Sequence, residues 1–505
     1  MACGLRALAV CVALAAATPT PTRAQKNPYA LPGRSAVVHL FEWKFRDIAR
    51  ECEEFLAPMG YAAVQTSPIA EHLSQPKKGH PWWERYQPMS FRIVSRSGNE
   101  SRFAEMVERC NYVGVRVYVD VVFNHMTGPL KPARSIAGTS ADGINRNYPE
   151  VPFHSNHFNP KCDIHTYNDV NQVRNCLLSG LNDLNQTNTY VREKIIDFLN
   201  RLIDHGVAGF RVDAAKHMWP ADLEYIYSQV KNLSARHGFA PGLRPFIYQE
   251  VIDLGGEGVK KTDYNAFARV TEFKYGAEIG NVFRGHNAMK WLKNFGSEWG
   301  LLPSGDALVF VDNHDNQRGH GAGGPTIITH KEPRLYKMAV AFMLSWPYGY
   351  PRVMSSYSFN NTDKGPPINK NSSIKNVTIT SNGKCGNGWV CEHRWPAIVN
   401  MIEFRNKVDG TAVANWWDNG NYQIAYSRGD KGFIVFNEEM GADLKQILKT
   451  GLAEGSYCDV ISGKKMRNKC TGRTVDVGKD GNAAITLLKE EEGVLAIHIG
   501  SKIHG

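Results

Sequence analysis

The feature that most constrains the fold is a repeated unit of an apolar helical stripe, a glycine and a short apolar run. In the first unit, apolar residues recur at helical spacing from Ile48 to Leu56, Gly60 follows, and residues 62–66 form the run. The same order recurs at 103–123 and at 191–212. A 3.6-residue apolar period predicts a helix with one buried face, and glycine commonly follows a helix end. Repeated helix–strand units predict parallel strands covered by helices.

The apolar runs predict eight strands, which is the number that closes a (β/α)8 barrel. The runs are 36–41, 62–66, 115–123, 207–212, 246–251, 270–275, 308–311 and 352–355. We therefore predict an α/β TIM barrel as the main body of the chain.

The repeat of helix and strand is interrupted by one long segment and ends near residue 410. After strand 3, residues 126–185 are rich in Asn, Gly, Pro and His and show little periodicity, and a loop this long is usually functional. After about residue 410, short strands at 424–426, 433–436, 484–488 and 494–499 alternate with Gly, Asp and Asn. We predict a barrel of residues 25–125 and 186–409, a small irregular inserted domain at 126–185, and a C-terminal antiparallel β-sandwich domain at 410–505.

The first 24 residues resemble a secretory signal peptide. Arg6 precedes an apolar run from Ala7 to Ala17, and a small-residue cleavage site ends at Ala24. That run is too short to span a bilayer, and no later run reaches about 18 apolar residues. We predict a soluble, secreted protein.

Eight cysteines remain after the leader, and an even number in a secreted chain predicts four disulfides. Cys52 and Cys110 lie on the core faces of two predicted helices, so we expect them to be bonded. We expect Cys162–Cys176 to hold the inserted domain and Cys458–Cys470 to lie in the C-terminal domain. The remaining two cysteines are Cys385 and Cys391.

Charge and cysteine spacing argue against two classes of site. The net charge is +10, but no dense Lys/Arg run is interleaved with aromatic residues, so nucleic-acid binding is not expected. No Cys-x-x-Cys pair is present, which argues against a zinc site.

Three acids follow apolar strands at the same predicted end of the barrel. In the stretch 209–217, alternation places Arg211 and Asp213 on one face of a strand. Glu250 and Asp315 end two further apolar runs. Each acid could form a structural ion pair, but active sites of this fold gather where the three meet. Converging carboxyls, one ionised and one carrying a proton, suit glycoside hydrolysis.

Four segments resemble the signature segments of the α-amylase family, and four more resemble the secreted animal members. The first are Gly-Phe-Arg-Val-Asp-Ala-Ala-Lys-His (209–217), Tyr-Gln-Glu-Val-Ile-Asp (248–253), Val-Asp-Asn-His-Asp-Asn-Gln (311–317) and Asp-Val-Val-Phe-Asn-His (120–125). The others are His-Leu-Phe-Glu-Trp (39–43), Pro-Trp-Trp-Glu-Arg-Tyr-Gln-Pro (81–88), Arg-Gly-His-Gly-Ala-Gly-Gly (318–324) and Cys-Glu-His-Arg-Trp (391–395). The similarity covers nearly the whole chain from about Ser35.

The resemblance implies a retaining endo-hydrolase of α-1,4-glucans such as starch, glycogen and maltooligosaccharides. It implies that Asp213 is the nucleophile, Glu250 the general acid and then base, and Asp315 the residue that stabilises the transition state. It also implies sugar contacts from aromatic, amide and imidazole groups. These are Trp82, Trp83, Tyr86, Gln87, His125, Tyr167, Lys216, His217, His314 and His320. His320 lies in a Gly-rich loop, 319–324, which we interpret as a flap over the cleft.

Two ions follow from the same resemblance. Oxygen ligands from Asn124 and Asp183, with backbone carbonyls of Arg174 and His217, would bind Ca2+. Taken alone, Asn124 would be a turn residue and Asp183 a solvated loop acid. Arg211, Asn313 and Arg352 would bind Cl−, because two arginines without a free carboxylate partner favour an anion. The alternative is that these arginines pair directly with Glu250 or Asp315.

Other functions remain open from the sequence. An exo-acting α-glucosidase or maltase of the same superfamily would have a closed pocket rather than an open cleft. A non-catalytic glucan binder or transporter accessory subunit would lack a carboxylate or carry a membrane anchor. The resemblance further predicts a monomer that acts in digestive fluid and meets proteinaceous inhibitors.

Overall fold

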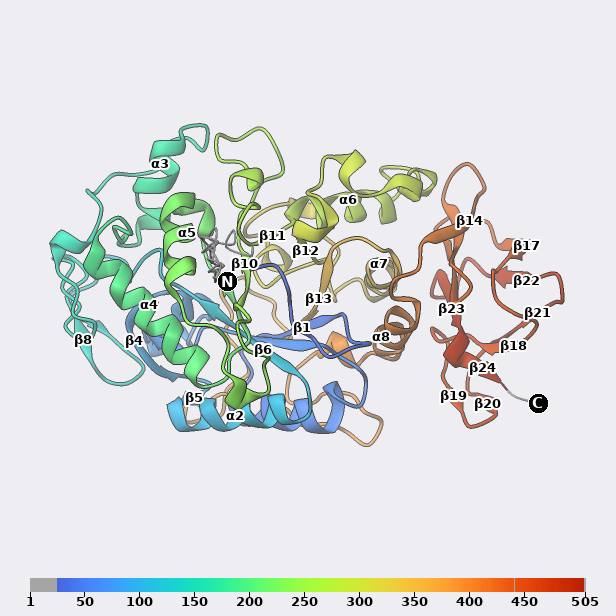
Figure 1. Ribbon diagram of the computed structural model, residues 1–505, viewed down its shortest axis with the longest axis horizontal. Coiled ribbons are helices and arrows are strands. Elements are labelled where there is room, and N and C mark those ends of the chain that lie inside the picture. The colour runs from blue at the N-terminus through green and yellow to red at the C-terminus, as the bar shows by residue number, and fades with distance from the viewer. Residues whose placement is uncertain (1–24, 440, 504–505) are drawn as a thin grey trace, which may run out of the picture.

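Eight parallel strands close into a barrel at the centre of the molecule (Figure 1), as the sequence predicts. This computed structural model describes residues 25–439 and 441–503, and the predicted leader, 1–24, lies outside the described residues. Around the barrel the order is β1, β13, β12, β11, β10, β9, β6, β2. In chain order the strands are β1 (Val37–Leu40), β2 (Ala63–Thr66), β6 (Arg116–Val121), β9 (Gly209–Val212), β10 (Phe246–Gln249), β11 (Arg269–Thr271), β12 (Ala307–Val309) and β13 (Tyr350–Ser355).

The α-helices lie outside these strands (Figure 1). They are α1 (Phe45–Glu51), α2 (Glu100–Tyr112), α3 (Val170–Asn175), α4 (Thr189–Asp204), α5 (Pro220–Gln229), α6 (Phe273–Phe283), α7 (Pro333–Ser345) and α8 (Pro396–Val408). The first predicted helix continues beyond α1 as a π-helical turn, Cys52–Leu56. Helix α4 has an N-terminal cap, because the Asn188 side chain accepts hydrogen bonds from Tyr190 N and Val191 N at its start. Gly206 follows its end with a φ of +97°.

Several predicted strands end earlier than expected, and one of them runs into the following helix. Residues 270–275 read as one apolar strand, but β11 ends at Thr271 and Phe273 begins helix α6. The Glu272 side chain accepts from Lys274 N and caps the helix at this point. A fully buried helix start and a buried strand have the same composition, so hydrophobicity alone could not separate them.

The segment between β6 and β9 is irregular, as its composition predicts. It holds the short strands β7 (Ala133–Arg134) and β8 (Ser140–Ala141), together with helix α3. The buried Glu71 carboxylate ties this segment to the preceding three-stranded sheet of β3 (Ala70–His72), β4 (Pro88–Ser95) and β5 (Gly98–Asn99). That carboxylate accepts from Ser135 Oγ at 2.5 Å and Ser90 Oγ at 2.6 Å.

The C-terminal part forms two larger antiparallel sheets and a two-stranded one. One contains β14 (Val413–Asp418), β15 (Gln423–Arg428), β16 (Gly432–Asn437) and β23 (Val494–His498). The other contains β17 (Leu444–Lys449), β22 (Asn482–Leu487), β21 (Thr474–Val477), β18 (Gly455–Cys458) and β24 (Lys502–Ile503), and β19 (Lys465–Met466) pairs with β20 (Lys469–Cys470).

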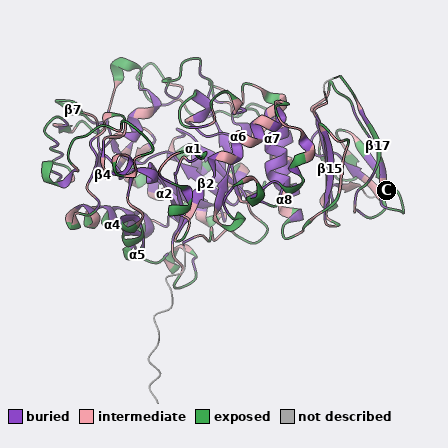
Figure 2. Ribbon diagram, turned by 90° about the horizontal axis from the view of Figure 1, so that it is seen from above, coloured by how far each residue is buried: buried purple, intermediate pink, exposed green. Residues whose placement is uncertain are grey.

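The first sheet packs into two different hydrophobic cores, because alternate side chains of its strands lie on opposite faces. Tyr426 and Phe436 pack with the barrel core, whereas Ala425 and Val435 pack with the second sheet. Ser345 Oγ at the end of α7 lies 2.6 Å from Tyr426 Oη, which joins the sheet to the barrel. Figure 2 shows the largely buried helices α7 and α8 on one side of this junction and the buried strand β15 on the other.

Four disulfides are present among the described residues. They are Cys52–Cys110, Cys162–Cys176, Cys385–Cys391 and Cys458–Cys470. The three pairings predicted individually are therefore confirmed. Within 25–439 and 441–503, no helix is both long and apolar enough to cross a membrane.

Candidate active site

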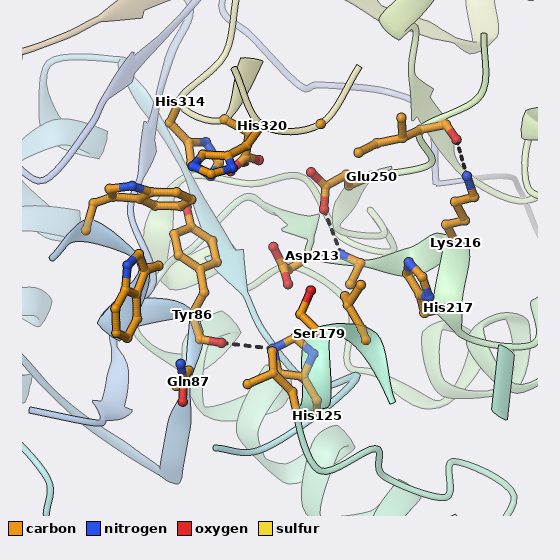
Figure 3. A pocket seen from close by; sticks show the side chains of 18 of the residues that line it. Tyr86, Gln87, His125, Ser179, Asp213, Lys216, His217, Glu250, His314 and His320 are labelled. Atoms are coloured by element: carbon orange, nitrogen blue, oxygen red, sulfur yellow. Dashed lines mark hydrogen bonds and ion pairs between the residues drawn. The ribbon is translucent and has the colours of Figure 1, made fainter. Parts of the chain in front are cut away.

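A cavity of about 710 Å3 opens at the carboxyl ends of the barrel strands. All three predicted acids and all ten predicted sugar-binding residues line it. Figure 3 shows Asp213 and Glu250 facing the same space, with Tyr86 and His314 on the opposite wall. Sequence reasoning missed further lining residues: Leu178, Ser179, Leu181, Ala214, Ile252, Glu257, Gly321 and Asp363. Most lie in loops of mixed composition, where sequence alone gave no periodic signal. Glu257 could have been sought as an acid seven residues beyond Glu250, and it forms an ion pair with Lys216.

Strand register brings Asp213 and Glu250 together. Val212 of β9 pairs with Gln249 of β10, so the next residue on each strand is one of the two acids. Ala214 then takes a left-handed conformation with a φ of +50°, and its N–H donates to Glu250 Oε2 at 2.9 Å. Such a conformation in a residue other than glycine is strained and is common at functional sites.

The Arg211 guanidinium lies between three carboxyls. Its Nη1 is 2.6 Å from Asp213 Oδ1 and 2.7 Å from Asp120 Oδ1, and its Nη2 is 2.6 Å from Glu250 Oε1. Asp120 on β6 is in register with Arg211 on β9, so the two side chains of this ion pair come from adjacent strands. The assumption that Arg211 lacks a carboxylate partner is therefore wrong. Sequence reasoning missed Asp120, although strand alternation in 116–121 could have indicated its inward face.

Three acids around one cation cannot all carry a full charge in a buried site. Burial raises the pKa of Asp213 well above its usual value; Arg211 opposes this, while Glu250 and Asp120 add to it. Burial also raises the pKa of Asp120, again against Arg211. Burial works to lower the pKa of Arg211, but the surrounding carboxylates raise it well above its usual range. Burial and mutual repulsion therefore favour a proton on the cluster more than on isolated carboxyls.

Asp315 enters the cavity from the segment after β12. Its carboxylate lies 3.3 Å from His314 Nε2, and burial with the Glu250 charge raises the pKa of Asp315 to about 7. The His314 ring stacks on the Tyr86 ring with centroids 5.0 Å apart, and Trp82 meets it edge-on at 5.5 Å. Tyr86 Oη donates to Asp120 Oδ2 at 2.9 Å, which links the aromatic wall to the acids.

The remaining wall carries hydrogen-bonding side chains. His125 Nε2 lies 2.9 Å from the Tyr86 carbonyl oxygen, and Gln87 Oε1 accepts from Gly128 N at 3.2 Å. Lys216 Nζ donates to the Ile252 carbonyl oxygen at 2.7 Å and lies 4.9 Å from the centroid of the Tyr167 ring. Aromatic faces and amide, imidazole and ammonium groups together suit a ligand with apolar ring faces and many hydroxyls.

The predicted calcium ligands lie outside the cavity, except His217. Asn124 Oδ1 is buried without a hydrogen-bond partner among the described residues. Asp183 forms a β-bridge with His125, the neighbour of Asn124, and burial raises the pKa of Asp183 to about 8. His217 Nδ1 lies 2.8 Å from the carbonyl oxygen of Val173, the neighbour of Arg174. An orphaned amide oxygen and a desolvated carboxyl fit a hard cation.

The Arg174 side chain is engaged elsewhere. Its guanidinium donates to Asp263 Oδ2 at 2.8 Å and Tyr264 Oη at 3.1 Å, which leaves its backbone carbonyl as the group that could face a cation.

The predicted chloride ligands differ in their surroundings. Arg352 is buried, donates to Gln65 Oε1 at 2.8 Å, and forms no ion pair within the described part of the chain. Burial lowers the pKa of Arg352, and the nearby Arg211 adds to this. Asn313 Oδ1 accepts from Asp315 N and Asn316 N, so its amide N–H groups remain as donors. A buried cation without a counter-charge fits an anion.

Comparisons with known proteins agree with this geometry. The sequence model of the alpha amylase catalytic domain matches residues 53–353, and that of the alpha amylase C-terminal all-beta domain matches 414–500. An alpha-amylase of Tribolium castaneum is 54% identical over 94% of this chain and 96% of its own length. A pancreatic alpha-amylase of Rattus norvegicus is 54% identical over 95% of this chain and 97% of its own.

A solved structure gives the same result. The crystal structure of a mutant alpha-amylase I of Eisenia fetida in complex with maltohexaose superposes with a TM-score of 0.90 at 47% identity. The match covers 93% of this chain and 98% of that one. From the matched domains, the identities and the shared barrel, we conclude that the chain belongs to the α-amylase family.

Proposed function

We infer that the protein hydrolyses internal α-1,4-glucosidic bonds of starch, glycogen and maltooligosaccharides. The observation that carries this inference is the meeting of Asp213, Glu250 and Asp315 in one cavity walled by aromatic rings. Relatives named alpha-amylase match nearly the whole chain, and the similar Eisenia fetida structure holds maltohexaose.

The geometry supports a double displacement with retention. One guanidinium contacts both Asp213 and Glu250, so their carboxyls are close together. Retaining glycosidases separate these groups by ~5 Å, whereas inverting enzymes need ~6.5–9.5 Å to admit a water. In the proposed reaction, Asp213 attacks the anomeric carbon while Glu250 protonates the leaving oxygen. Glu250 then removes a proton from the water that hydrolyses the glycosyl–Asp213 ester.

Charge balance assigns the supporting roles. Arg211 lies 2.6 Å from Asp213 and opposes the rise that burial causes in the pKa of this proposed nucleophile. Glu250 lies 2.6 Å from the other terminal nitrogen of the same guanidinium, where it would serve the acid step. Asp315 faces the same space and would stabilise the positive charge that develops on the sugar ring in an oxocarbenium-like transition state.

We propose that Ca2+ binds to Asn124, Asp183 and the carbonyls of Arg174 and His217. The support is the orphaned Asn124 Oδ1 and the buried Asp183 carboxyl. A bound ion would neutralise Asp183 and join the inserted segment to the residues that follow β9, which would stabilise the fold by linkage.

We propose that Cl− binds to Arg211, Asn313 and Arg352. Arg352, buried without a carboxylate partner within the described residues, is the main support. Arg211 already meets three carboxyls, so its contribution would be secondary. A bound anion would favour the protonated acids nearby.

We propose secretion, on the leader-like residues 1–24 and the four disulfides. The domain boundaries at 125/126, 185/186 and 409/410 are likewise proposed. The monomeric state, the action in digestive fluid and the binding of proteinaceous inhibitors stay predictions from the resemblance.

The decisive experiment is a product time course on a long maltooligosaccharide blocked at its non-reducing end. An endo-acting enzyme cuts inside the chain and releases several shorter products from the start. An exo-acting α-glucosidase cannot process a blocked end, and a non-catalytic binder leaves the substrate intact. Failure to cleave the blocked substrate, with glucose release from an unblocked one, would refute the endo assignment.

A further inference from the structure

The 3-10 helix Trp82–Tyr86 presents two kinds of side chain to two different environments. Trp82 and Trp83 line the cavity. Glu84, on the same turn, points into the protein, and its side chain is 1% exposed. The helix that forms one wall of the cleft therefore carries a buried acid behind its aromatic residues.

The Glu84 carboxyl closes the loop that leads into this helix. Its Oε2 accepts from Gln75 N at 2.8 Å, and its Oε1 lies 3.0 Å from His80 Nδ1. His80 N also donates to the Gln75 carbonyl oxygen at 3.1 Å. One carboxyl thus holds both ends of the segment 75–80 against the turn that carries the tryptophans.

His80 in turn supports a second loop that holds the tryptophans by their indole N–H groups. Trp82 Nε1 donates to the Thr362 carbonyl oxygen at 2.9 Å, and Trp83 Nε1 donates to Asp363 Oδ1 at 3.3 Å. In the same loop, a Cβ added to Gly365 would lie 1.8 Å from the His80 carbonyl oxygen, so the two backbones are in close contact. His80 takes a left-handed conformation, with a φ of +54°, to present this carbonyl.

We propose that His80 and Glu84 are positioning residues for the Trp82–Trp83 pair, and that they make glucan binding at this wall depend on the protonation of Glu84. The proposal rests on the function proposed above. It adds a pH-sensitive support behind the substrate-binding wall, separate from the catalytic acids.

The two groups titrate in different ranges. Burial raises the pKa of Glu84 to about 7; Gln75 N–H and Arg96 oppose the rise. Burial lowers the pKa of His80 to about 4, and Arg96 adds to this. Near neutral pH the imidazole is therefore uncharged while the carboxyl changes state. The protonated carboxyl donates to His80 Nδ1, whereas the carboxylate must accept from His80 Nδ1–H, which requires the other tautomer.

Other charged groups around Glu84 do not remove the dependence of its protonation on pH. Arg96, after β4, lies 3.8 Å from Glu84 Oε1, beyond hydrogen-bond distance. Arg85 on the same turn is paired with Glu42, which follows β1, at 2.7 Å. Glu42 works to raise the pKa of Glu84, and Arg85 works to lower it. When Glu84 is ionised, the nearby positive charges only partly compensate its buried negative charge. The turn that Glu84 holds is then less stable.

The test compares wild-type protein with Glu84→Gln and with Glu108→Gln, an exposed control on α2. KM and kcat for the blocked maltooligosaccharide are measured from pH 6 to pH 8.5. We expect the wild-type KM to rise about threefold to tenfold above pH 7, the size of one hydrogen bond. Glu84→Gln cannot ionise, so its KM stays flat near the low-pH value. The pH dependence of kcat keeps its wild-type form, and Glu108→Gln behaves as wild type.

A KM of Glu84→Gln that rises with pH as in the wild type would overturn the proposal. Cleavage of the blocked substrate by the wild type keeps that result distinct from a failure of the proposed function. Should Glu84→Gln not fold, as judged by near-UV circular dichroism, His80→Gly provides the second test. Glycine adopts the left-handed conformation freely and removes the imidazole that contacts Glu84. The KM of His80→Gly should already be raised at pH 6, where the wild-type KM is low; a wild-type KM profile would overturn the proposal.

Discussion

At the scale of single residues, the charge around Arg211 decides what the site can do. Asp120, Asp213 and Glu250 all contact one guanidinium, so the cluster carries more acids than one cation can balance. A site of this kind holds a carboxylate and a protonated acid at the same pH, which glycoside hydrolysis requires. Arg211 thus positions the two acids that we propose as nucleophile and general acid.

Replacing Asp213 with Asn tests the nucleophile. The amide keeps the shape of the side chain but cannot form the glycosyl ester, so kcat should fall by about four orders of magnitude. Binding of maltooligosaccharide, measured by calorimetry, should persist because the aromatic wall is intact. Asp197→Asn, an exposed position on α4, is the matched control. Turnover by Asp213→Asn within tenfold of the wild type would exclude the assignment.

Replacing Arg352 with Gln tests the anion site. Gln keeps a donor for Gln65 but removes the buried positive charge that would hold chloride. Wild-type activity near neutral pH should drop severalfold in chloride-free buffer and return on adding chloride. The variant should show low activity and no response to the halide. Equal activity of the wild type with and without chloride would contradict the site.

Whether a contact between these residues could be predicted depended on how far apart they lie in the sequence. Alternation within one strand placed Arg211 and Asp213 on the same face, and the structure confirms their contact. Asp120 lies 91 positions from Arg211, and only the register between β6 and β9 joins them. Segment resemblance supplied the sugar-binding residues, which no local pattern would have gathered. Loop residues such as Ser179 and Asp363 had neither signal.

At the scale of elements, the separation between β9 and β10 sets the distance between Asp213 and Glu250, the proposed nucleophile and acid. Gly209 begins β9 opposite Phe246 of β10, and an added Cβ would lie 2.2 Å from the Phe246 carbonyl oxygen. Only glycine lets the two backbones approach this closely. The residue that permits the contact is four positions before Asp213 on the same strand.

Gly209→Ala should therefore impair both stability and catalysis. The methyl group must push β9 from β10, which we expect to cost about 3 kcal/mol of unfolding free energy. A displacement of Asp213 by ~1 Å would lower kcat about 100-fold. Urea unfolding and kcat measure the two effects. Gly305→Ala, where no atom lies within 4 Å of the added Cβ, is the control. Wild-type values for Gly209→Ala would show that the strand spacing is not constrained here.

Element boundaries were harder to predict than element order. The order of eight strands followed from repeated helix–glycine–strand units, because that periodicity reflects burial on both faces of a parallel sheet. The end of the sixth strand did not, because Phe273–Tyr275 is apolar in either conformation and the Glu272 cap decides between them. Tertiary contacts supply that information.

At the scale of the whole molecule, the segment 126–185 and the barrel meet along a polar junction. Asn124 follows β6, Asp183 ends the inserted segment, and His217 follows the catalytic strand β9. An unpartnered amide oxygen and a desolvated acid at such a junction would destabilise it without a cation. The proposed calcium site thus lies where three parts of the chain depend on one another.

Calcium removal should therefore weaken the whole fold, and the loss should depend on Asp183. A chelator is expected to lower the melting temperature of the wild type by about 3 °C, and Ca2+ should restore it, because a ligand at ~100 times its Kd stabilises a chain of this size by about 2.7 kcal/mol. Mg2+ should restore it poorly, since Mg2+ demands a tighter octahedral site. Asp183→Asn should melt lower than the wild type in Ca2+ and respond little to the chelator, while Asp163→Asn, exposed in the same segment, should respond as the wild type does. If Asp183→Asn lost as much thermal stability to the chelator as the wild type does, the ion would bind elsewhere. The stability of the fold would then not depend on a cation at this junction.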